Sequence, residues 1–238
     1  MPRYTAVASA LSVLVLAGCA EHLPTPPAIA ASSASAALQR SADAGLTLHP
    51  SGFGEESYAA WKAKEGKTDD HGNADHALYF QKMVPTATVA AGIAVIDGVS
   101  GLPASAIAGL SWEHRTDGHC GAGAPRWNLG LEAPDGTRFT VFLGCAAAAK
   151  GPITTDDQGR TWIRDTYPGL GVGGIAAQIE AATGLPVADL TVRSLLIVFD
   201  EGNDVGPGFV YLDNITVTIG TETTVFTGPM DNGDGDGR

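Results

Sequence analysis

The stretch Val192–Val217, VRSLLIVFDEGNDVGPGFVYLDNITV, decides the fold. It contains two apolar segments, rich in β-branched and aromatic residues, on either side of an acidic link that contains Gly202, Gly206, Pro207 and Gly208. This pattern predicts two strands joined by a hairpin turn, at the centre of a sheet.

Short apolar segments separated by turn residues continue upstream, which is typical of an all-β sandwich or barrel. Residues 138–142 and 214–219 alternate with period two, and Pro134–Thr137 is a hairpin-turn signal. One short helix is predicted over Gly174–Thr183, ended by Gly184. The predicted strands are Leu78–Met83, Thr88–Asp97, Ala108–His114, Arg126–Glu132, Arg138–Leu143, Thr161–Thr166, Leu190–Phe199, Phe209–Thr218 and Thr223–Phe226.

The first 18 residues have the pattern of an export signal. Arg3 precedes the apolar run Tyr4–Leu16, whose 13 residues fall well short of the roughly 20 that span a bilayer. The run ends in Leu-Ala-Gly-Cys, which resembles the bacterial lipobox. The resemblance implies that Cys19 is lipidated and becomes the mature N-terminus, anchored at the extracytoplasmic face of the cell envelope.

Composition divides the rest of the chain into three regions. Residues 19–76 are expected to form an Ala/Ser/Pro-rich tether and a polar lead-in, in which the loop with His71 and His76 is interpreted as solvated rather than metal-binding. Residues 77–228 are enough for one core and are expected to form the sandwich domain. Residues 229–238 form an acidic tail that matches only the first half of an EF-hand loop, and disorder is favoured.

Net charge indicates which partners to expect, and cysteine content indicates the redox state expected of the chain. A formal net charge of −12 repels phosphate backbones, so nucleic acid is excluded as an expected partner. Cys120 and Cys145 remain after Cys19 is set aside, and an even pair in an exported chain predicts one disulfide. A metal-thiolate pair and a nucleophile are the alternatives, and no CxxC or Cys/His spacing supports them.

Two segments, His119–Leu129 and Phe199–Val217, resemble a family of uncharacterised secreted proteins from high-GC Gram-positive bacteria. The similarity covers Ala77–Thr218. The ending Tyr211–Val217 is also similar to the last strand of jelly-roll carbohydrate-binding modules. The resemblance implies an antiparallel, jelly-roll-like β-sandwich and export, and it implies no catalytic residue.

The acidic link is the first candidate site. Asp200, Glu201 and Asp204, with Asp213 on the adjoining strand, offer the oxygen ligands that Ca²⁺ takes. A structural calcium ion is therefore one interpretation. The favoured alternative is a solvated turn whose acids cap backbone amides.

Aromatic residues supply the second candidate site. Trp162 and Tyr167 flank a turn-rich segment, so we expect them to be exposed and to form a platform for a sugar ring. Arg126 is a polar candidate for the same ligand, and we also expect it to pair with an acid and anchor the Cys120 loop. Trp112 and Trp127 lie in predicted strands and are expected in the core.

These features favour a non-catalytic binding role at the envelope, with glycan as the leading ligand class. One alternative is a glycan hydrolase or lyase, which needs two carboxyl groups in a cleft about 5–9 Å apart. Candidate groups are Glu113–His114 with Asp117, or Glu201 with Asp204, but spacing in the sequence does not place them in a cleft, and no catalytic residue is assigned. The other alternative is a structural or protein-interaction lipoprotein, which would expose an apolar patch.

Overall fold

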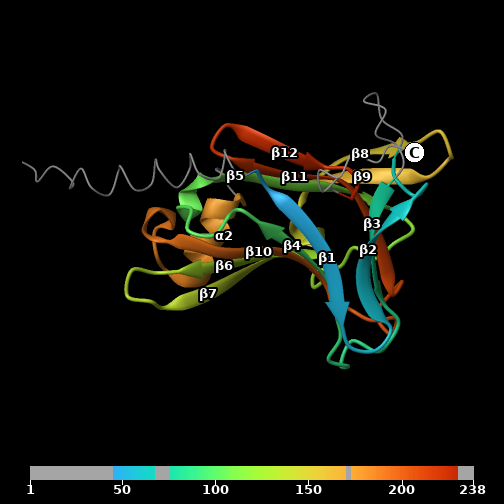
Figure 1. Cartoon of the computed structure of the whole chain (residues 1–238), viewed down its shortest axis with the longest axis horizontal. Coiled ribbons are helices and arrows are strands. Elements are labelled where there is room, and N and C mark those ends of the chain that lie inside the picture. Colours follow the sequence, from blue (N-terminus) through green and yellow to red (C-terminus); the bar gives the residue numbers. More distant parts are fainter. Residues whose placement is uncertain (1–44, 68–75, 170–172, 230–238) are drawn as a thin grey trace, which may run out of the picture.

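Two antiparallel sheets pack face to face in the computed structural model of the chain (Figure 1). The structure describes residues 45–67, 76–169 and 173–229. The predicted all-β sandwich with one short helix is confirmed.

The strands divide into sheet A and sheet B, and neighbours within each sheet are antiparallel. Sheet A has the spatial order β1 (Thr47–Phe53), β4 (Ala91–Asp97), β10 (Thr191–Phe199), β6 (Arg126–Glu132) and β7 (Arg138–Gly144). Sheet B has the order β2 (Ser57–Ala63), β3 (His76–Lys82), β11 (Phe209–Ile219), β5 (Ile107–Arg115), β9 (Thr161–Pro168) and β8 (Ala149–Thr155), and β12 (Glu222–Phe226) also pairs with β11.

Eight of these strands follow the order of a jelly roll. Sheet A contributes β4-β10-β6-β7, and sheet B contributes β3-β11-β5-β9. Along these eight strands the chain changes sheet at each step except at the β6–β7 hairpin. Two four-stranded sheets connected in this way form the double-sheet jelly roll. β1, β2 and β8 extend the edges of the sheets, and β12 pairs with the end of β11 beyond β3.

The stretch that decides the fold contributes an interior strand to each sheet, and its link is not a hairpin. β10 lies in sheet A and β11 in sheet B, so residues 200–208 cross from one sheet to the other. Ile197 and Phe199 on β10 and Val210 and Leu212 on β11 are fully buried in one shared core. The hairpin prediction is wrong because burying both apolar faces against each other requires the two strands to lie in opposite layers.

The sandwich begins before the predicted boundary at Ala77. β1 pairs with β4 and β2 pairs with β3, so the expected polar lead-in is wrong over Thr47–Phe53 and Ser57–Ala63. β8 was also not predicted. All three are edge strands, where little side-chain surface is buried, and Pro50 and Pro152 interrupt the apolar alternation of β1 and β8.

A stack of aromatic rings joins the two sheets through the core. Trp112 on β5 and Trp127 on β6 are fully buried, with ring centroids 5.1 Å apart and planes 23° apart. The Tyr167 ring meets Trp112 edge-on at 5.6 Å. The predicted core positions of the two tryptophans are therefore confirmed.

The predicted helix is present as α2 (Ile175–Thr183). It packs against β7 and buries Ile175 and Ile179. Gly184 ends it with φ +71°, donating its N–H to the Glu180 carbonyl. Short 3₁₀ helices form at η1 (Ala104–Ala106), η2 (Cys145–Ala147) and η3 (Val187–Asp189). Within the described ranges, no helix is both long and apolar enough to cross a membrane.

A buried lysine ties two loops together at one end of the sandwich. Lys82, at the end of β3, is 1% exposed. Its ammonium group donates to the carbonyl oxygens of Thr86 at 2.9 Å, Thr88 at 2.8 Å and Asp200 at 2.8 Å. All three of its N–H donors are thus used, and they join the β3–β4 loop to the link between β10 and β11.

Candidate functional site

The acidic link directs its carboxylates to separate protein groups. Asp200 accepts two hydrogen bonds from the Arg126 guanidinium group, at 2.5 and 2.7 Å. Glu201 Oε2 lies 2.6 Å from His119 Nε2 and accepts the Ala124 backbone N–H at 3.0 Å. These contacts hold the segment before β6 against the link, which is the anchoring role expected of Arg126.

The other two predicted calcium ligands also have protein partners. Asp204 accepts the backbone N–H of Thr86 at 2.7 Å and its hydroxyl at 2.8 Å, and these hydrogen bonds lower the pKa of Asp204 below 3.8. Asp213, on β11, accepts the N–H groups of Lys67 at 2.5 Å and Asn214 at 2.6 Å. The four acids therefore accept hydrogen bonds from different backbone and side-chain donors, and a calcium site stays a prediction.

Trp162 and Tyr167 are buried, so the prediction of an exposed sugar platform there is wrong. Trp162 is 0% exposed and donates its indole N–H to Asp156 at 3.0 Å. The Arg160 guanidinium carbon lies 5.8 Å from the Trp162 ring centroid and covers it. Tyr167 is 1% exposed, and its hydroxyl donates to the Gly144 carbonyl at 2.9 Å. Burial raises the pKa of Tyr167 above its usual value.

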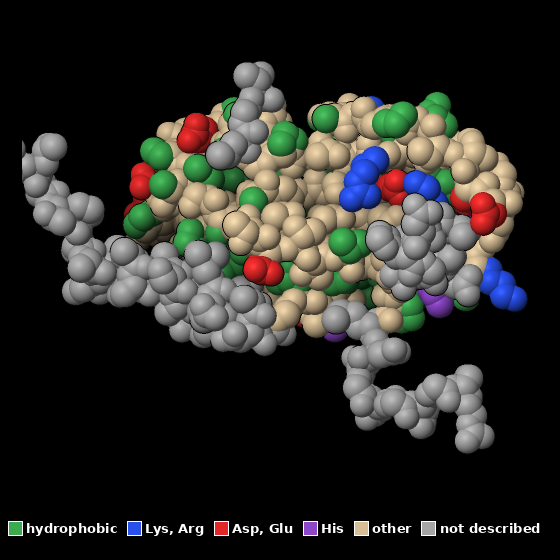
Figure 2. All heavy atoms as spheres, turned by 90° about the horizontal axis from the view of Figure 1, so that it is seen from above, with side chains coloured by type: hydrophobic (Ala, Val, Ile, Leu, Met, Phe, Trp, Pro, Cys, Tyr) green, Lys and Arg blue, Asp and Glu red, His purple; other side chains and the backbone are tan. Residues whose placement is uncertain are grey.

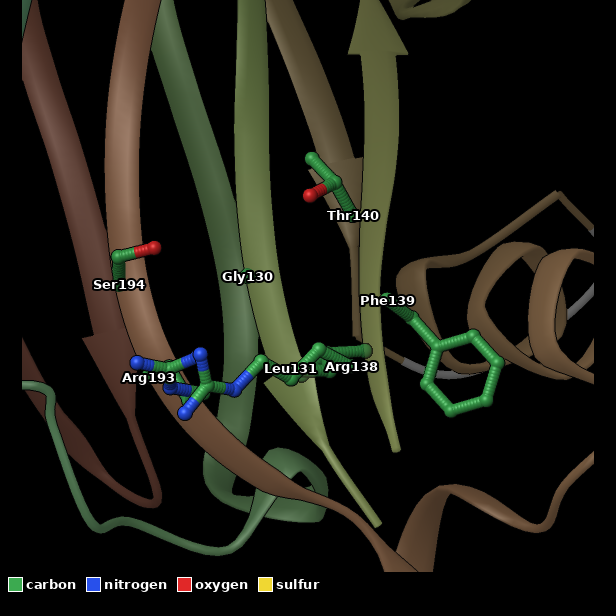
Figure 3. A pocket seen from close by; sticks show the side chains of 7 residues that line it. All are labelled: Gly130, Leu131, Arg138, Phe139, Thr140, Arg193 and Ser194. Atoms are coloured by element: carbon green, nitrogen blue, oxygen red, sulfur yellow. The ribbon is translucent and has the colours of Figure 1, made fainter. Parts of the chain in front are cut away.

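A hollow of about 320 Å³ opens on the outer face of sheet A, away from the core (Figure 3). It forms over Gly130 on β6, where the strand has no side chain. Ser194 and Thr140 pair with Gly130 from either side, so their hydroxyl groups flank it. The lining consists of Gly130, Leu131, Arg138, Phe139, Thr140, Arg193 and Ser194.

Two arginines give the hollow a positive charge. Arg138 extends from β7 across β6 toward Arg193 on β10 (Figure 3). The Nε atoms of Arg138 and Arg193 lie 3.2 and 3.4 Å from the same carboxylate oxygen of Glu132. One carboxylate shared by two guanidinium groups leaves a net positive charge beside the hollow.

An exposed ring lies on the same face as the hollow. Phe142 is 58% exposed, and it stands two residues after Thr140 on β7, so both side chains point outward. The Arg126 guanidinium carbon lies 5.2 Å from the Phe142 ring centroid, and Asn128 is opposite Phe142 in the β6–β7 register. Sequence reasoning missed Phe142 because alternation shows which residues share a face, not which face is covered.

A second group of rings lies on the outer face of sheet B. Tyr79 is at its centre, with ring centroids 5.8 Å from Tyr58, 6.2 Å from Phe209 and 4.7 Å from Tyr211. Burial, with the neighbouring Tyr58 and Tyr211, raises the pKa of Tyr79 to about 12. These rings contact one another, and each of the four residues is less exposed than Phe142. Seen from the side of β8, β11 and β12, apolar side chains form separate small groups (Figure 2).

The predicted disulfide between Cys120 and Cys145 is present, and it lies in a polar cluster. The ligating atoms of these two residues, His114 and Asp165 all lie within 4.8 Å of one another. Sequence reasoning missed this grouping because His114 and Asp165 lie on different strands, and no metal-ligand spacing links them to the cysteines.

Several predicted features lie outside the described residues. They are the signal segment 1–18, Cys19, residues 20–44 of the tether, most of the loop with His71, and the tail from residue 230. Lipidation of Cys19 therefore stays a prediction.

No protein-family model matches the chain, and searches of curated proteins and of solved structures find no match either. Function is therefore argued from the geometry of the sites, because a jelly roll by itself supports many functions.

Proposed function

We propose that the protein binds an acidic glycan without catalysis, on the outer face of sheet A. The supporting observation is the hollow over Gly130 beside the exposed ring of Phe142. Carbohydrate recognition needs an apolar surface for the C–H face of a sugar ring and polar groups for its hydroxyls. Phe142 supplies the first, and Ser194 and Thr140 supply the second.

The arginines favour a ligand that carries carboxylates. A guanidinium group binds a carboxylate with two parallel hydrogen bonds, whereas a neutral sugar offers only hydroxyl groups. The side chains of Arg138 and Arg193 are 68% and 42% exposed, and exposed ion pairs with Glu132 contribute little free energy. A ligand carboxylate can therefore replace Glu132. Oligosaccharides that contain uronic acids are the proposed ligand class.

The place of binding follows from the sequence of the first residues. A lipid on Cys19 would hold the domain at the extracytoplasmic face of the envelope, and residues 20–44 would serve as its tether. An acidic envelope polysaccharide would then lie within reach of the domain. No calcium ion is required for this mode of binding.

No observation on the described residues favours either alternative, the glycan hydrolase or lyase or the structural or protein-interaction lipoprotein. The seven residues that line the hollow include no acid, and Glu113, on the other sheet, accepts hydrogen bonds from Lys67 and Asn214. Hydrolysis at the hollow therefore has no candidate acid pair. The exposed large apolar side chains come from six separate segments: Phe53, Val89, Phe142, Ile153, Val205 and Val225.

Isothermal titration of the purified full chain with uronic-acid oligosaccharides tests the proposal. We expect Phe142→Ala and Arg193→Ala each to weaken binding at least about tenfold, since each removes one main contact. Phe53→Ala is the matched control, because Phe53 is also in sheet A and is 48% exposed but lies on β1. Its affinity should equal that of the wild type.

A second variant tests the hollow without changing a charge. A Cβ atom at residue 130 would lie 2.3 Å from the Ser194 hydroxyl, so Gly130→Val fills the space and should abolish binding while β6 remains a strand. Absence of millimolar binding to every acidic and neutral glycan would refute the proposal. Equal binding of a carboxyl-reduced oligosaccharide would keep the glycan site and refute its preference for acidic sugars.

A further inference from the structure

The buried carboxylate of Asp165 lies against the disulfide, on the inner face of sheet B. Asp165 is 0% exposed. Its Oδ2 accepts the Trp112 indole N–H at 2.7 Å and lies 2.6 Å from His114 Nδ1. Its Oδ1 accepts a hydrogen bond from the Lys150 ammonium group at 2.6 Å. Burying a carboxylate costs several kcal/mol, so a cluster of this kind calls for a reason beyond packing.

The disulfide does not explain the cluster. A covalent link stabilises a fold without polar neighbours. Here Asp165 Oδ2 lies 3.2 Å from Cys145 Sγ, and a disulfide sulfur has no hydrogen to donate. Two electron-rich atoms therefore face each other. The Lys150 ammonium group, 2.6 Å from Asp165 Oδ1 and 3.5 Å from Cys145 Sγ, partly offsets this contact in the oxidised protein. A proton on the sulfur, or a metal ion bound by both atoms, would make the contact favourable.

We propose that reduction of the disulfide converts this cluster into a transition-metal site of the zinc class. The four ligands are Cys120, Cys145, His114 and Asp165, each of which offers one ligand atom within 4.8 Å of the others. Two thiolates, one imidazole and one carboxylate form a ligand set that zinc takes in tetrahedral sites.

The reaction balances with an external dithiol as the reductant. The dithiol supplies two electrons and two protons and becomes a disulfide, while the S–S bond of the protein breaks and gives two thiols. Zn²⁺ then displaces the two thiol protons into solvent. The bound ion, two thiolates and one carboxylate carry a net charge of −1, and the adjacent Lys150 ammonium offsets it.

Small movements complete the geometry. With metal–sulfur distances of about 2.3 Å, tetrahedral binding places the two sulfurs about 3.7 Å apart. Cys120 is half-buried and packs against the edge of the core, whereas Cys145 is 0% exposed, so we expect Cys120 to make the larger movement. Trp112 and Lys150 already hold the carboxylate in place, which is the supporting role that outer groups have at metal sites.

Cobalt titration of the reduced full chain tests the proposal. Cys19→Ser is used as the background, so that Cys120 and Cys145 are the only thiols. We expect one equivalent of Co²⁺ to give a thiolate-to-cobalt charge-transfer band that Zn²⁺ removes, and the oxidised chain to give none. His114→Gln should weaken Co²⁺ binding at least about tenfold, and the matched control His49→Gln, at an exposed histidine, should not.

The outcomes are distinct even if the metal-free reduced chain unfolds. In that case equimolar Zn²⁺ must restore the native circular dichroism spectrum, because ligand binding drives folding. The proposal is overturned if the fully reduced chain gives no charge-transfer band, if Zn²⁺ fails to refold an unfolded reduced chain, or if His114→Gln binds as tightly as the background chain.

Discussion

Replacing Lys82 with methionine tests whether its three hydrogen bonds hold two loops together. Methionine keeps the length and the apolar stem of the side chain and removes only the ammonium group. The carbonyl groups of Thr86, Thr88 and Asp200 then lose their common donor. We expect Lys82→Met to fold but to be clearly less stable than the wild type.

The expected magnitude follows from two opposing contributions. Each carbonyl left without a donor costs about 1–3 kcal/mol, so three cost about 3–9 kcal/mol. Removing the buried ammonium group offsets part of this cost, because the group loses several kcal/mol of hydration free energy when it is buried. The net loss is about 3 kcal/mol, which corresponds to a midpoint lower by about 6–12 °C for a domain of this size.

Urea and thermal unfolding of the full chain provide the assay. Lys64→Met is the matched control, since the side chain of Lys64 is exposed and its loss should change stability by less than about 0.5 kcal/mol. Hydrogen exchange should also quicken at the Gly202 amide, which donates to the Thr86 hydroxyl. A Lys82→Met loss below about 1 kcal/mol would refute the reasoning.

Three further predictions concern single sites. Burial alone would raise the pKa of Asp156, but hydrogen bonds, from Trp162 first, hold that pKa below 3.8. The ionised Asp156 carboxylate therefore stabilises the fold above pH 3.8, and this stabilisation is lost as the pH falls through the lowered pKa. The difference in unfolding free energy between wild type and Asp156→Asn should shrink when unfolding curves are measured at decreasing pH. Gly184→Ala should cost about 1 kcal/mol in urea unfolding, because the helix ends there at φ +71°; no change would contradict the strained cap. The double variant Cys120→Ser, Cys145→Ser should lose about 3 kcal/mol without metal, as a closed loop of 25 residues implies; equal midpoints in chemical denaturation would contradict it.

The sequence was most informative where apolar and polar residues alternate without interruption or apolar residues run together, and this includes the edge strand β7, predicted over residues 138–143 and observed over Arg138–Gly144. β6 has the predicted bounds, Arg126–Glu132, and β10 and β11 agree with prediction to within one residue at each end. Interior strands bury side chains on at least one whole face, so their apolar content is high and visible. Edge strands such as β1 and β8 bury little, and turn residues inside them hide the pattern.

The candidate sites depended on information that a linear pattern does not contain. Trp162 follows a turn, which usually indicates exposure, but Arg160 folds back over its ring. Phe142 lies in a clearly alternating strand, yet only the packing of the second sheet decides that it faces solvent. His114 and Asp165 meet the disulfide because β5 and β9 are neighbours, a pairing that the sequence does not specify.

The positions of β10 and β11 have a consequence for synthesis on the ribosome. Without these two strands, the sandwich consists of four unconnected ladders: β1-β4, β6-β7, β2-β3 and β5-β9-β8. Both joining strands follow all the strands that they join, so a nascent polypeptide cannot close its core until residue 219 has been made. Folding of the sandwich must therefore follow synthesis of residue 219, through contacts of large sequence separation. Chains arrested before Thr191 should remain open to proteases, whereas chains released after Ile219 should become resistant together, in one cooperative step.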